Sequence, residues 1–284
     1  MNDTSEKNCL VTGGTSGIGA AAARELAHLG NTVIISGRSA GKCARQVEKI
    51  KHSVPGAHVE FLLADLSSQK QVRQLAKEFK ERYSHLDVLI NNAGAIFANH
   101  LVSVDGLEMT FAVNHLSCFL LTNLLLDQLK AGRSARIVVV SSAAHTHGSI
   151  DFEDLQSEHH YERVQAYAKS KLANIYFTYA LARRLEGTSV TVNALHPGSV
   201  ATNLGGNNNW LKTKLRNHLK PGMLSPDEGA KTIVYLSASP DVEGVTGKYF
   251  SDCKAVRSSD DSYNKENAEK LWMLSEKLAG IVEN

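Results

Sequence analysis

A tyrosine and a lysine stand four positions apart, at Tyr167 and Lys171. They lie in a run from Arg163 to Glu186 with apolar residues at helical spacing, which predicts a helix that ends before Gly187. Residues i and i+4 share one face of a helix. A cation beside a phenol lowers its pKa from about 10, which suits proton transfer at a carbonyl or alcohol. The same spacing is typical of a surface pair, so the rest of the chain has to decide between the two interpretations.

A glycine-rich turn follows the first apolar run of the chain, Asn8 to Val11. The turn is Thr-Gly-Gly-Thr-Ser-Gly-Ile-Gly over residues 12–19, and it precedes a helical pattern that reaches Leu29 and a β-branched strand over 32–36. This succession of strand, turn, helix and strand is the context of a dinucleotide-binding site. Glycines let the backbone approach a pyrophosphate, and the helix N-terminus attracts the anion.

Arginine stands near the end of the second predicted strand, in the sequence Gly37-Arg38-Ser39. An acidic residue there would bond the ribose 2′-hydroxyl of NAD and repel a 2′-phosphate. A guanidinium instead matches the geometry of a phosphate. The sequence therefore favours NADP(H) over NAD(H), with a solvent-facing arginine as the alternative.

Strand-like and helix-like segments alternate along the whole chain. This pattern predicts an α/β fold in a single domain, residues 1–284: a doubly wound, Rossmann-type parallel sheet of about seven strands with helices on both faces. The segment from Leu107 to Leu129 is expected to be one long helix. The later strands are expected over 59–64, 86–90, 137–140, 190–195 and 248–250.

Motifs on these segments resemble those of the short-chain dehydrogenase/reductase superfamily. They are the spacing Thr-Gly-x-x-x-Gly-x-Gly of the turn, the tetrad Asn91-Asn92-Ala93-Gly94, then Asn114, Ser142, and Tyr167 with Lys171. Ser142 is assigned by the superfamily motif, and Ser141 is the alternative. The long insert over 145–165 and the continuation Tyr-Ala-Lys-Ser-Lys-Leu-Ala-Asn over 167–174 are similar to the retinol dehydrogenase-like branch.

The resemblance implies an oxidoreductase that moves a hydride between a nicotinamide and a carbonyl or alcohol. In that scheme Tyr167 is the general acid and base, and Lys171 lowers its pKa and binds the nicotinamide ribose. Ser142 holds the substrate oxygen. Asn114 kinks its helix and holds a water that links Lys171 to solvent. The implied substrate is a small lipophilic molecule of retinal, steroid, quinone or aldehyde type.

The resemblance also implies which residues bind NADP(H). Asp65 lies beside the adenine, the tetrad steadies the sheet and lines the adenine-side ribose, and a Pro-Gly-x-Val-x-Thr turn meets the nicotinamide carboxamide. The full expected set is Gly13, Thr15, Ser16, Gly17, Ile18, Gly19, Arg38, Ser39, Asp65, Leu66, Asn92, Ala93, Gly94, Tyr167, Lys171, Pro197, Gly198, Val200 and Thr202.

The amino-acid composition limits the classes of partner that the protein is expected to bind. A net charge of +2 gives no push toward nucleic acid, and no apolar run is long enough for a membrane span. Four scattered cysteines suggest neither disulfides nor a metal site, and with no signal peptide pattern they fit the cytoplasm. The histidines of the insert (His145, His147, His159 and His160) are interpreted as solvated rather than metal-binding.

Residues 203–225 are rich in glycine and asparagine and are expected to form a mobile lid over the substrate. The basic amphipathic part, 210–220, has two interpretations: a solvated short helix, which is favoured, or a surface that touches a membrane or lipid. Many retinol dehydrogenases carry an N-terminal membrane anchor. Here the residues before the first strand are few and polar, so no anchor is expected.

Other functions stay open at this point. A member of this fold can act as a non-catalytic NADP-sensing protein, although such proteins usually lack part of the Asn-Ser-Tyr-Lys set that this chain keeps. An NAD-dependent alcohol dehydrogenase and a sugar-nucleotide epimerase or dehydratase are further enzyme options; the last prefers another glycine spacing and a larger C-terminal domain. The resemblance is compatible with a homodimer or a homotetramer.

Overall fold

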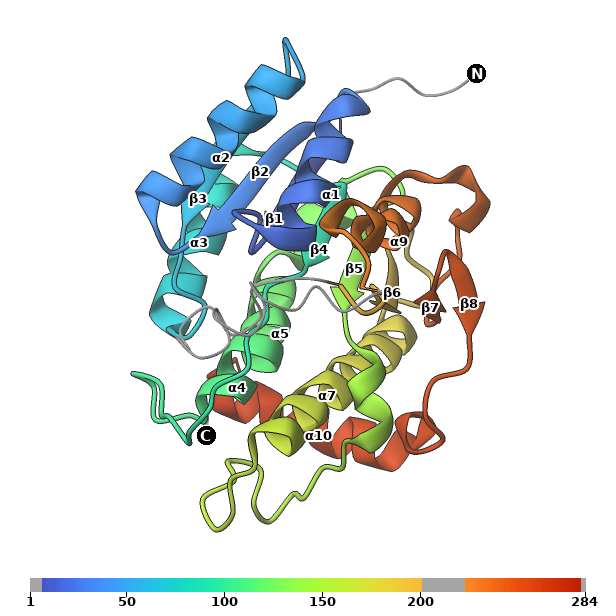
Figure 1. The fold of residues 1–284 in the computed structure, drawn as a ribbon. Coiled ribbons are helices and arrows are strands. Elements are labelled where there is room, and N and C mark those ends of the chain that lie inside the picture. The colour runs from blue at the N-terminus through green and yellow to red at the C-terminus, as the bar shows by residue number, and fades with distance from the viewer. Residues whose placement is uncertain (1–6, 201–222, 282–284) are drawn as a thin grey trace.

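Figure 1 shows a computed structural model of the chain, which describes residues 7–200 and 223–281. Eight strands of the described residues form one sheet in the order β3-β2-β1-β4-β5-β6-β7-β8. Neighbours from β3 to β7 are parallel, and β8 is antiparallel to β7. The strands are β1 Asn8–Thr12, β2 Thr32–Gly37, β3 Val59–Leu63, β4 Val88–Asn91, β5 Arg136–Val140, β6 Thr191–His196, β7 Tyr249–Ser251 and β8 Lys254–Val256.

Helices cover both faces of the sheet, as expected for a doubly wound fold (Figure 1). α1, α2 and α9 pack on one face, and α3, α5 and α7 pack on the other with α10 behind α7. The helices are α1 Gly17–His28, α2 Ala40–Ser53, α3 Gln69–Arg82, α4 Met109–Phe111, α5 Ser117–Leu124, α6 Leu126–Ala131, α7 Arg163–Arg184, α9 Pro226–Ala238 and α10 Lys265–Leu278. The prediction of a single-domain Rossmann-type fold is confirmed.

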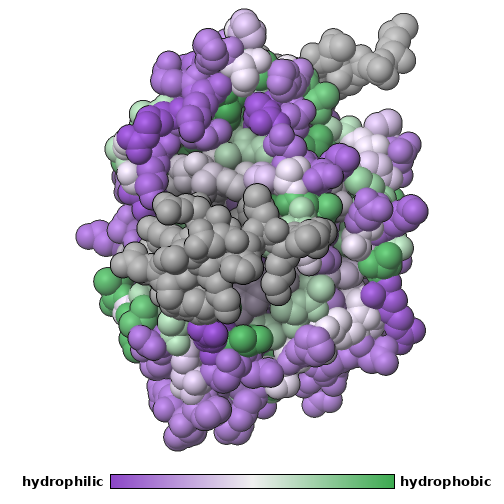
Figure 2. Space-filling view, viewed as in Figure 1, coloured by the Kyte–Doolittle hydropathy of each residue, from purple (hydrophilic) through white to green (hydrophobic). Residues whose placement is uncertain are grey.

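The two faces of the sheet bury two separate cores. Successive strand residues point to opposite faces, so Val11 and Ile35 pack under α1 and α2, whereas Leu10 and Ile34 pack under α3 and α5. α2 buries only three residues, and Figure 2 shows hydrophilic residues gathered over this helix. The strand order reverses at β1, which lies between β2 and β4, and open α/β sheets bind their ligands at such a point.

The long helical stretch expected over 107–129 is interrupted by a π-helical turn that contains Asn114, the residue for which the resemblance implied a kink. α4 is followed by a π-helical turn, Ala112–Leu116, and then by α5 and α6. Side chains take up carbonyl groups of this π-helical turn: Ser117 Oγ donates to the Val113 carbonyl at 2.8 Å, and Asn174 Nδ2 donates to the Asn114 carbonyl at 3.0 Å. Such donors favour a π turn over the regular α-helical ladder, and one of them comes from another helix.

The last strand, β8, was not expected. A turn at Asp252 and Cys253, with φ of 48° and 58°, joins it to β7. Hairpin turns that need positive φ usually carry Asn-Gly or Asp-Gly, so this dipeptide gave no hairpin signal. All three β8 residues are exposed, and the alternation that marks a half-buried strand is therefore missing as well.

One histidine interpretation is wrong. His145 is buried, with 2% of its surface exposed. Its Nε2 accepts a hydrogen bond from the Ser259 amide at 3.0 Å, so its Nδ1 is the nitrogen that donates to the Ser142 carbonyl at 2.7 Å. Ser259 is distant in sequence, which is why no local pattern could reveal the contact. His147, His159 and His160 are exposed as expected.

None of the helices that the structure describes is both long enough and apolar enough to cross a membrane. The predicted lid lies outside the described residues except at 223–225.

Candidate active site

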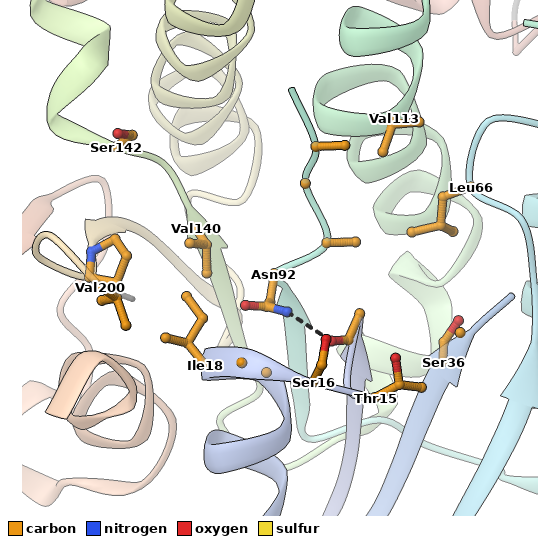
Figure 3. A pocket seen from close by; sticks show the side chains of 18 of the residues that line it. Thr15, Ser16, Ile18, Ser36, Leu66, Asn92, Val113, Val140, Ser142 and Val200 are labelled. Atoms are coloured by element: carbon orange, nitrogen blue, oxygen red, sulfur yellow. Dashed lines mark hydrogen bonds between the residues drawn. The ribbon is translucent and has the colours of Figure 1, made fainter. Parts of the chain in front are cut away.

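A single pocket at the carboxyl edge of the sheet joins the glycine turn to the Tyr167–Lys171 pair. In Figure 3, Ser36 and Leu66 lie toward one end of it, and Ser142 and Val200 lie toward the other. Its lining includes these predicted residues: Gly13, Thr15, Ser16, Gly17, Ile18, Gly19, Arg38, Asp65, Leu66, Asn92, Ala93, Gly94, Ser142, Tyr167, Lys171, Pro197, Gly198 and Val200. Ser39 and Asn114 lie outside the lining, and Thr202 falls outside the described residues.

Glycines of the turn bring the backbone to the pocket surface beside the side chains of Thr15, Ser16 and Ile18. Gly13 has φ of +66°, a conformation that favours glycine. A Cβ at Gly19 would collide with Nδ2 of Asn92 and would lie 2.6 Å from the Gly13 carbonyl oxygen. Ser16 precedes α1 without a side-chain cap, and the first turn of α1 holds no acidic residue. The N-terminus of α1 therefore presents its amide groups and positive dipole end to an anion in the pocket.

Asn92 ties the glycine turn to the end of β4. Its Nδ2 donates to the Thr12 carbonyl at 2.8 Å, and Thr12 Oγ1 accepts from the amides of Asn92 and Ala93 at 3.0 and 3.1 Å. Figure 3 shows the Asn92 amide turned toward the glycine turn. Asn92 Oδ1 is buried and has no hydrogen-bond partner among the described residues. A buried acceptor without a donor is costly, so this oxygen suits a hydroxyl of a ligand in the pocket.

Arg38 and Asp65 follow β2 and β3 at the same end of the pocket. Arg38 is exposed and lines the pocket, directly before Ser39, which caps α2. The Asp65 carboxylate accepts from the amide and hydroxyl of Ser67 at 3.0 and 2.8 Å, which makes a local turn. The cation and the N-terminus of α2 could hold a second anion at this end.

Tyr167 and Ser142 lie together at the other end. A side-chain hydrogen bond with Ser142 lowers the pKa of the Tyr167 phenol, but burial raises it more, so the pKa of Tyr167 stands above its usual value. Ser141 has a different environment, because it is buried and its Oγ donates to the Lys171 carbonyl at 2.8 Å. Both serines line the pocket, but Ser142 bonds Tyr167, whereas the Ser141 hydroxyl donates to the Lys171 carbonyl.

Lys171 is buried beneath Tyr167. Its Nζ donates to the Val140 carbonyl at 2.9 Å and lies 5.6 Å from the centroid of the Tyr167 ring. Burial lowers the pKa of Lys171 to about 8, so the ammonium carries only part of its charge in mildly alkaline solution. The sequence argument expected this lysine to lower the pKa of Tyr167. In the structure, burial is the dominant influence on the pKa of Tyr167.

Asn114 lies behind the pocket, in the π-helical turn, and is 1% exposed. Its Oδ1 accepts from the Ala95 amide at 2.8 Å, and its Nδ2 donates to the Ala95 carbonyl and to Ser170 Oγ, both at 2.9 Å. The residue thus fixes the loop after the tetrad to α7. A Cβ on Gly94 would lie 3.2 Å from Lys171 Nζ, so this loop and the lysine are in close contact.

Several residues of the site received no role from the sequence. Phe97, Val113 and His196 line the pocket, and His196 Nδ1 accepts from the Ala143 amide at 3.2 Å next to Ser142. Asn174 supports the π-helical turn from α7. A signal for Asn174 was present, since positions 167, 170, 171 and 174 recur at i, i+3, i+4 and i+7 and share one helix face.

Comparison with known proteins agrees with this geometry. Residues 7–211 match the family model for short chain dehydrogenases. Retinol dehydrogenase 14 of Mus musculus is 44% identical over 289 residues, which cover 97% of this chain and 86% of that protein. Polyprenol dehydrogenase of Homo sapiens is 42% identical over 286 residues, which cover 98% and 86%. The chain belongs to the short-chain dehydrogenase/reductase family of oxidoreductases. Within the family it is a member of the retinol dehydrogenase-like branch.

Solved structures share the fold. A protein of uncharacterised function from Mycobacterium paratuberculosis aligns with a TM-score of 0.78 at 34% identity, over 96% of this chain and 93% of that one. A short chain dehydrogenase from Burkholderia cenocepacia, solved in complex with NADP, aligns with a TM-score of 0.68 at 28% identity, over 86% of this chain and 95% of that one.

Proposed function

We propose that this chain uses NADP(H) to interconvert a carbonyl and an alcohol on a lipophilic substrate, with Tyr167 as the general acid and base. The observation that carries the proposal is the shared pocket. The glycine turn, Ser142, Tyr167 and Lys171 all line it, so a dinucleotide on the turn reaches the groups that can hold and protonate a substrate oxygen.

The residues at the glycine-turn end fit NADP(H). The glycines of the turn and the N-terminus of α1 suit the pyrophosphate, and the unpaired Oδ1 of Asn92 suits a hydroxyl donor. Arg38 suits the 2′-phosphate, since a guanidinium pairs with phosphate oxygens. When bound, NADP(H) supplies the hydride in reduction and accepts it in oxidation. The NADP complex of the Burkholderia relative supports this assignment.

The proton chemistry follows from the environment of Tyr167. Its raised pKa keeps the phenol protonated near neutral pH, so Tyr167 is ready to donate a proton to the oxygen of a carbonyl that is being reduced. Ser142 holds that oxygen by a hydrogen bond. Lys171 in its charged form stabilises the tyrosinate that remains. The protonated phenol is the form that carbonyl reduction requires, and alcohol oxidation requires the tyrosinate.

A lipophilic substrate is supported by the apolar side chains that share the pocket, Phe97, Val113, Val140 and Val200. Two relatives are named for the dehydrogenation of retinol and polyprenol, both long apolar alcohols. Apolar walls with a few polar groups are the usual composition of such sites.

Tyr167→Phe tests the function. With NADPH and a panel of retinal, steroid ketones, quinones and aliphatic aldehydes, we expect kcat to fall about a hundredfold to ten-thousandfold, because the ring remains but the proton donor is lost. NADPH binding, followed by fluorescence, should stay intact. Tyr83→Phe is the control, since Tyr83 Oη is bonded to Glu60 at the protein surface. Full turnover in Tyr167→Phe would overturn the proposed mechanism.

The alternatives give different results. A protein that binds NADPH but reduces no carbonyl in the panel is the non-catalytic NADP-sensing protein. Equal or tighter binding of NADH indicates the NAD-dependent alcohol dehydrogenase, to be followed by assays of alcohol oxidation.

A further inference from the structure

The π-helical turn Ala112–Leu116 is held by donors that are not part of the helical ladder. A π turn spaces its backbone hydrogen bonds one residue further apart than an α-helix, so nearby carbonyls lose their regular partners. Ser117 Oγ takes the Val113 carbonyl, and Asn174 Nδ2 takes the Asn114 carbonyl. The second donor belongs to α7, 60 positions further along the chain.

The amide of Asn174 is itself fixed in orientation. Asn174 is 2% exposed, and its Oδ1 lies 3.3 Å from Nδ1 of His115. Nε2 of His115 lies 2.9 Å from Ser275 Oγ on α10. Since an amide oxygen only accepts, His115 Nδ1 must donate to it, and Nε2 then accepts from the Ser275 hydroxyl. This buried chain connects α10 to the π-helical turn and leaves the Asn174 NH₂ group facing the Asn114 carbonyl.

The π-helical turn in turn places Asn114. Both ends of its side-chain amide bind Ala95, and Nδ2 also binds Ser170 Oγ. Ser170 Oγ donates to the Tyr167 carbonyl at 2.7 Å. A regular α-helix through 112–116 would rotate Asn114 away from these partners, because each residue turns by about 100° around the axis.

We propose that Asn174 is a positioning residue: by holding the Asn114 carbonyl it fixes the π-helical turn, and through Asn114 it sets the loop after the tetrad against α7. The role rests on the proposed function, because what is positioned is the Tyr167 and Lys171 end of the pocket. Asn174 does not line the pocket, so its effect on the reacting groups passes through Asn114.

The test uses Asn174→Asp, which keeps the shape but loses the donor, and Asn174→Ser as a second variant whose hydroxyl is too short to reach. Ser237→Ala is the matched control, because Ser237 is equally buried, on α9, and its hydroxyl donates to the Ile233 carbonyl of its own helix. For both Asn174 variants we expect kcat to fall about tenfold to a hundredfold with KM unchanged, as for a displaced catalytic group. Hydrogen exchange in peptides covering 110–118 and 93–97 should accelerate. The control should change neither.

The exchange measurement separates this proposal from the proposed function. If Tyr167→Phe retains full turnover, the function is wrong, and exchange alone decides the role of Asn174. Faster exchange in the two peptides, with the rest of the chain unchanged, supports the positioning role. Wild-type exchange and wild-type kcat in Asn174→Asp and Asn174→Ser would overturn it.

Discussion

At the glycine-turn end of the pocket, glycines bring the backbone to the surface between the side chains of Thr15, Ser16 and Ile18, whereas the Tyr167 end is supported from behind by buried, hydrogen-bonded side chains. Gly13 and Gly19 contribute nothing beyond the main chain, and a Cβ at Gly19 has no room. At the other end, Asn114, Asn174 and Lys171 are at most 3% exposed, and each bonds a backbone carbonyl outside its own helix.

The difference predicts how each end fails. Where the backbone itself forms the surface of the site, added side-chain atoms obstruct the ligand, and the affinity for the dinucleotide falls. A buried hydrogen-bonded network is disrupted when a donor is lost or a charge changes, and either the stability of the fold or the rate of the catalytic step falls. The four predictions below use this contrast, from the largest expected effect to the smallest.

Acid should destabilise the fold through His115, in the network of buried side chains. Burial lowers the pKa of His115 from 6.5 to about 4. Between these values the unfolded chain binds a proton that the folded chain does not, so stability is full above about pH 6.5 and falls as the pH drops toward 4. The expected loss is on the order of 3 kcal/mol.

Urea unfolding across this pH range measures the slope for wild type, His115→Gln and the control His147→Gln, since His147 is exposed. His115→Gln should flatten the slope, and the control should keep it. An unchanged slope in His115→Gln would show that other groups, such as buried His145, account for the acid sensitivity.

Gly19→Ala should weaken NADPH binding about a hundredfold, since overpacking against a rigid backbone costs roughly 1–3 kcal/mol. The new Cβ meets the Gly13 carbonyl at 2.6 Å. Gly41→Ala is the control, because the nearest atom to its Cβ is the Arg45 guanidinium at 3.5 Å. Fluorescence titration with NADPH gives both affinities. Wild-type affinity in Gly19→Ala would mean that the turn does not cradle the dinucleotide.

Arg38→Ala should weaken NADPH binding about thirtyfold and leave NADH binding nearly unchanged, because a hydrogen bond to a charged group contributes about 1.5–3 kcal/mol. Lys51→Ala, at the far end of α2, controls for the loss of a surface charge. Parallel titrations with the two dinucleotides report the ratio. A loss of equal size for NADH would remove the 2′-phosphate from the explanation.

Alkaline pH should slow carbonyl reduction, because Lys171 loses its charge. Its pKa is lowered to about 8, so the charge is present below that pH and is lost above it. We expect kcat/KM to fall about tenfold per pH unit above this value. In Lys171→Arg the guanidinium stays charged, so any remaining activity should hold to higher pH. A flat wild-type profile through this range would show that the lysine charge does not act in the reaction.

The local sequence pattern was enough to predict elements whose structure depends on neighbouring residues. The capping box of Ser225 and Glu228, whose sequence signature is a serine followed three residues later by a glutamate, forms at the start of α9 with both of its hydrogen bonds. The extent of α7 and the glycine turn before α1 also follow from spacing alone. The local sequence pattern did not predict the π-helical turn after α4, the strand β8 or the burial of His145. The π-helical turn and His145 depend on partners far along the chain, and β8 follows a turn whose sequence carries no hairpin signal.

The sequence by itself determined the order of the strands and helices and the helix face that Tyr167 and Lys171 share, since periodicity and glycine positions are properties of the chain. The tertiary structure decided the electrostatics and the contacts between elements. Burial raised the pKa of Tyr167 and lowered that of Lys171, and this effect could not be inferred from the spacing of the two residues. The amide of Asn174 reached the Asn114 carbonyl only because α7 packs against the π-helical turn, and desolvation and long-range hydrogen bonds exist only once the elements are packed.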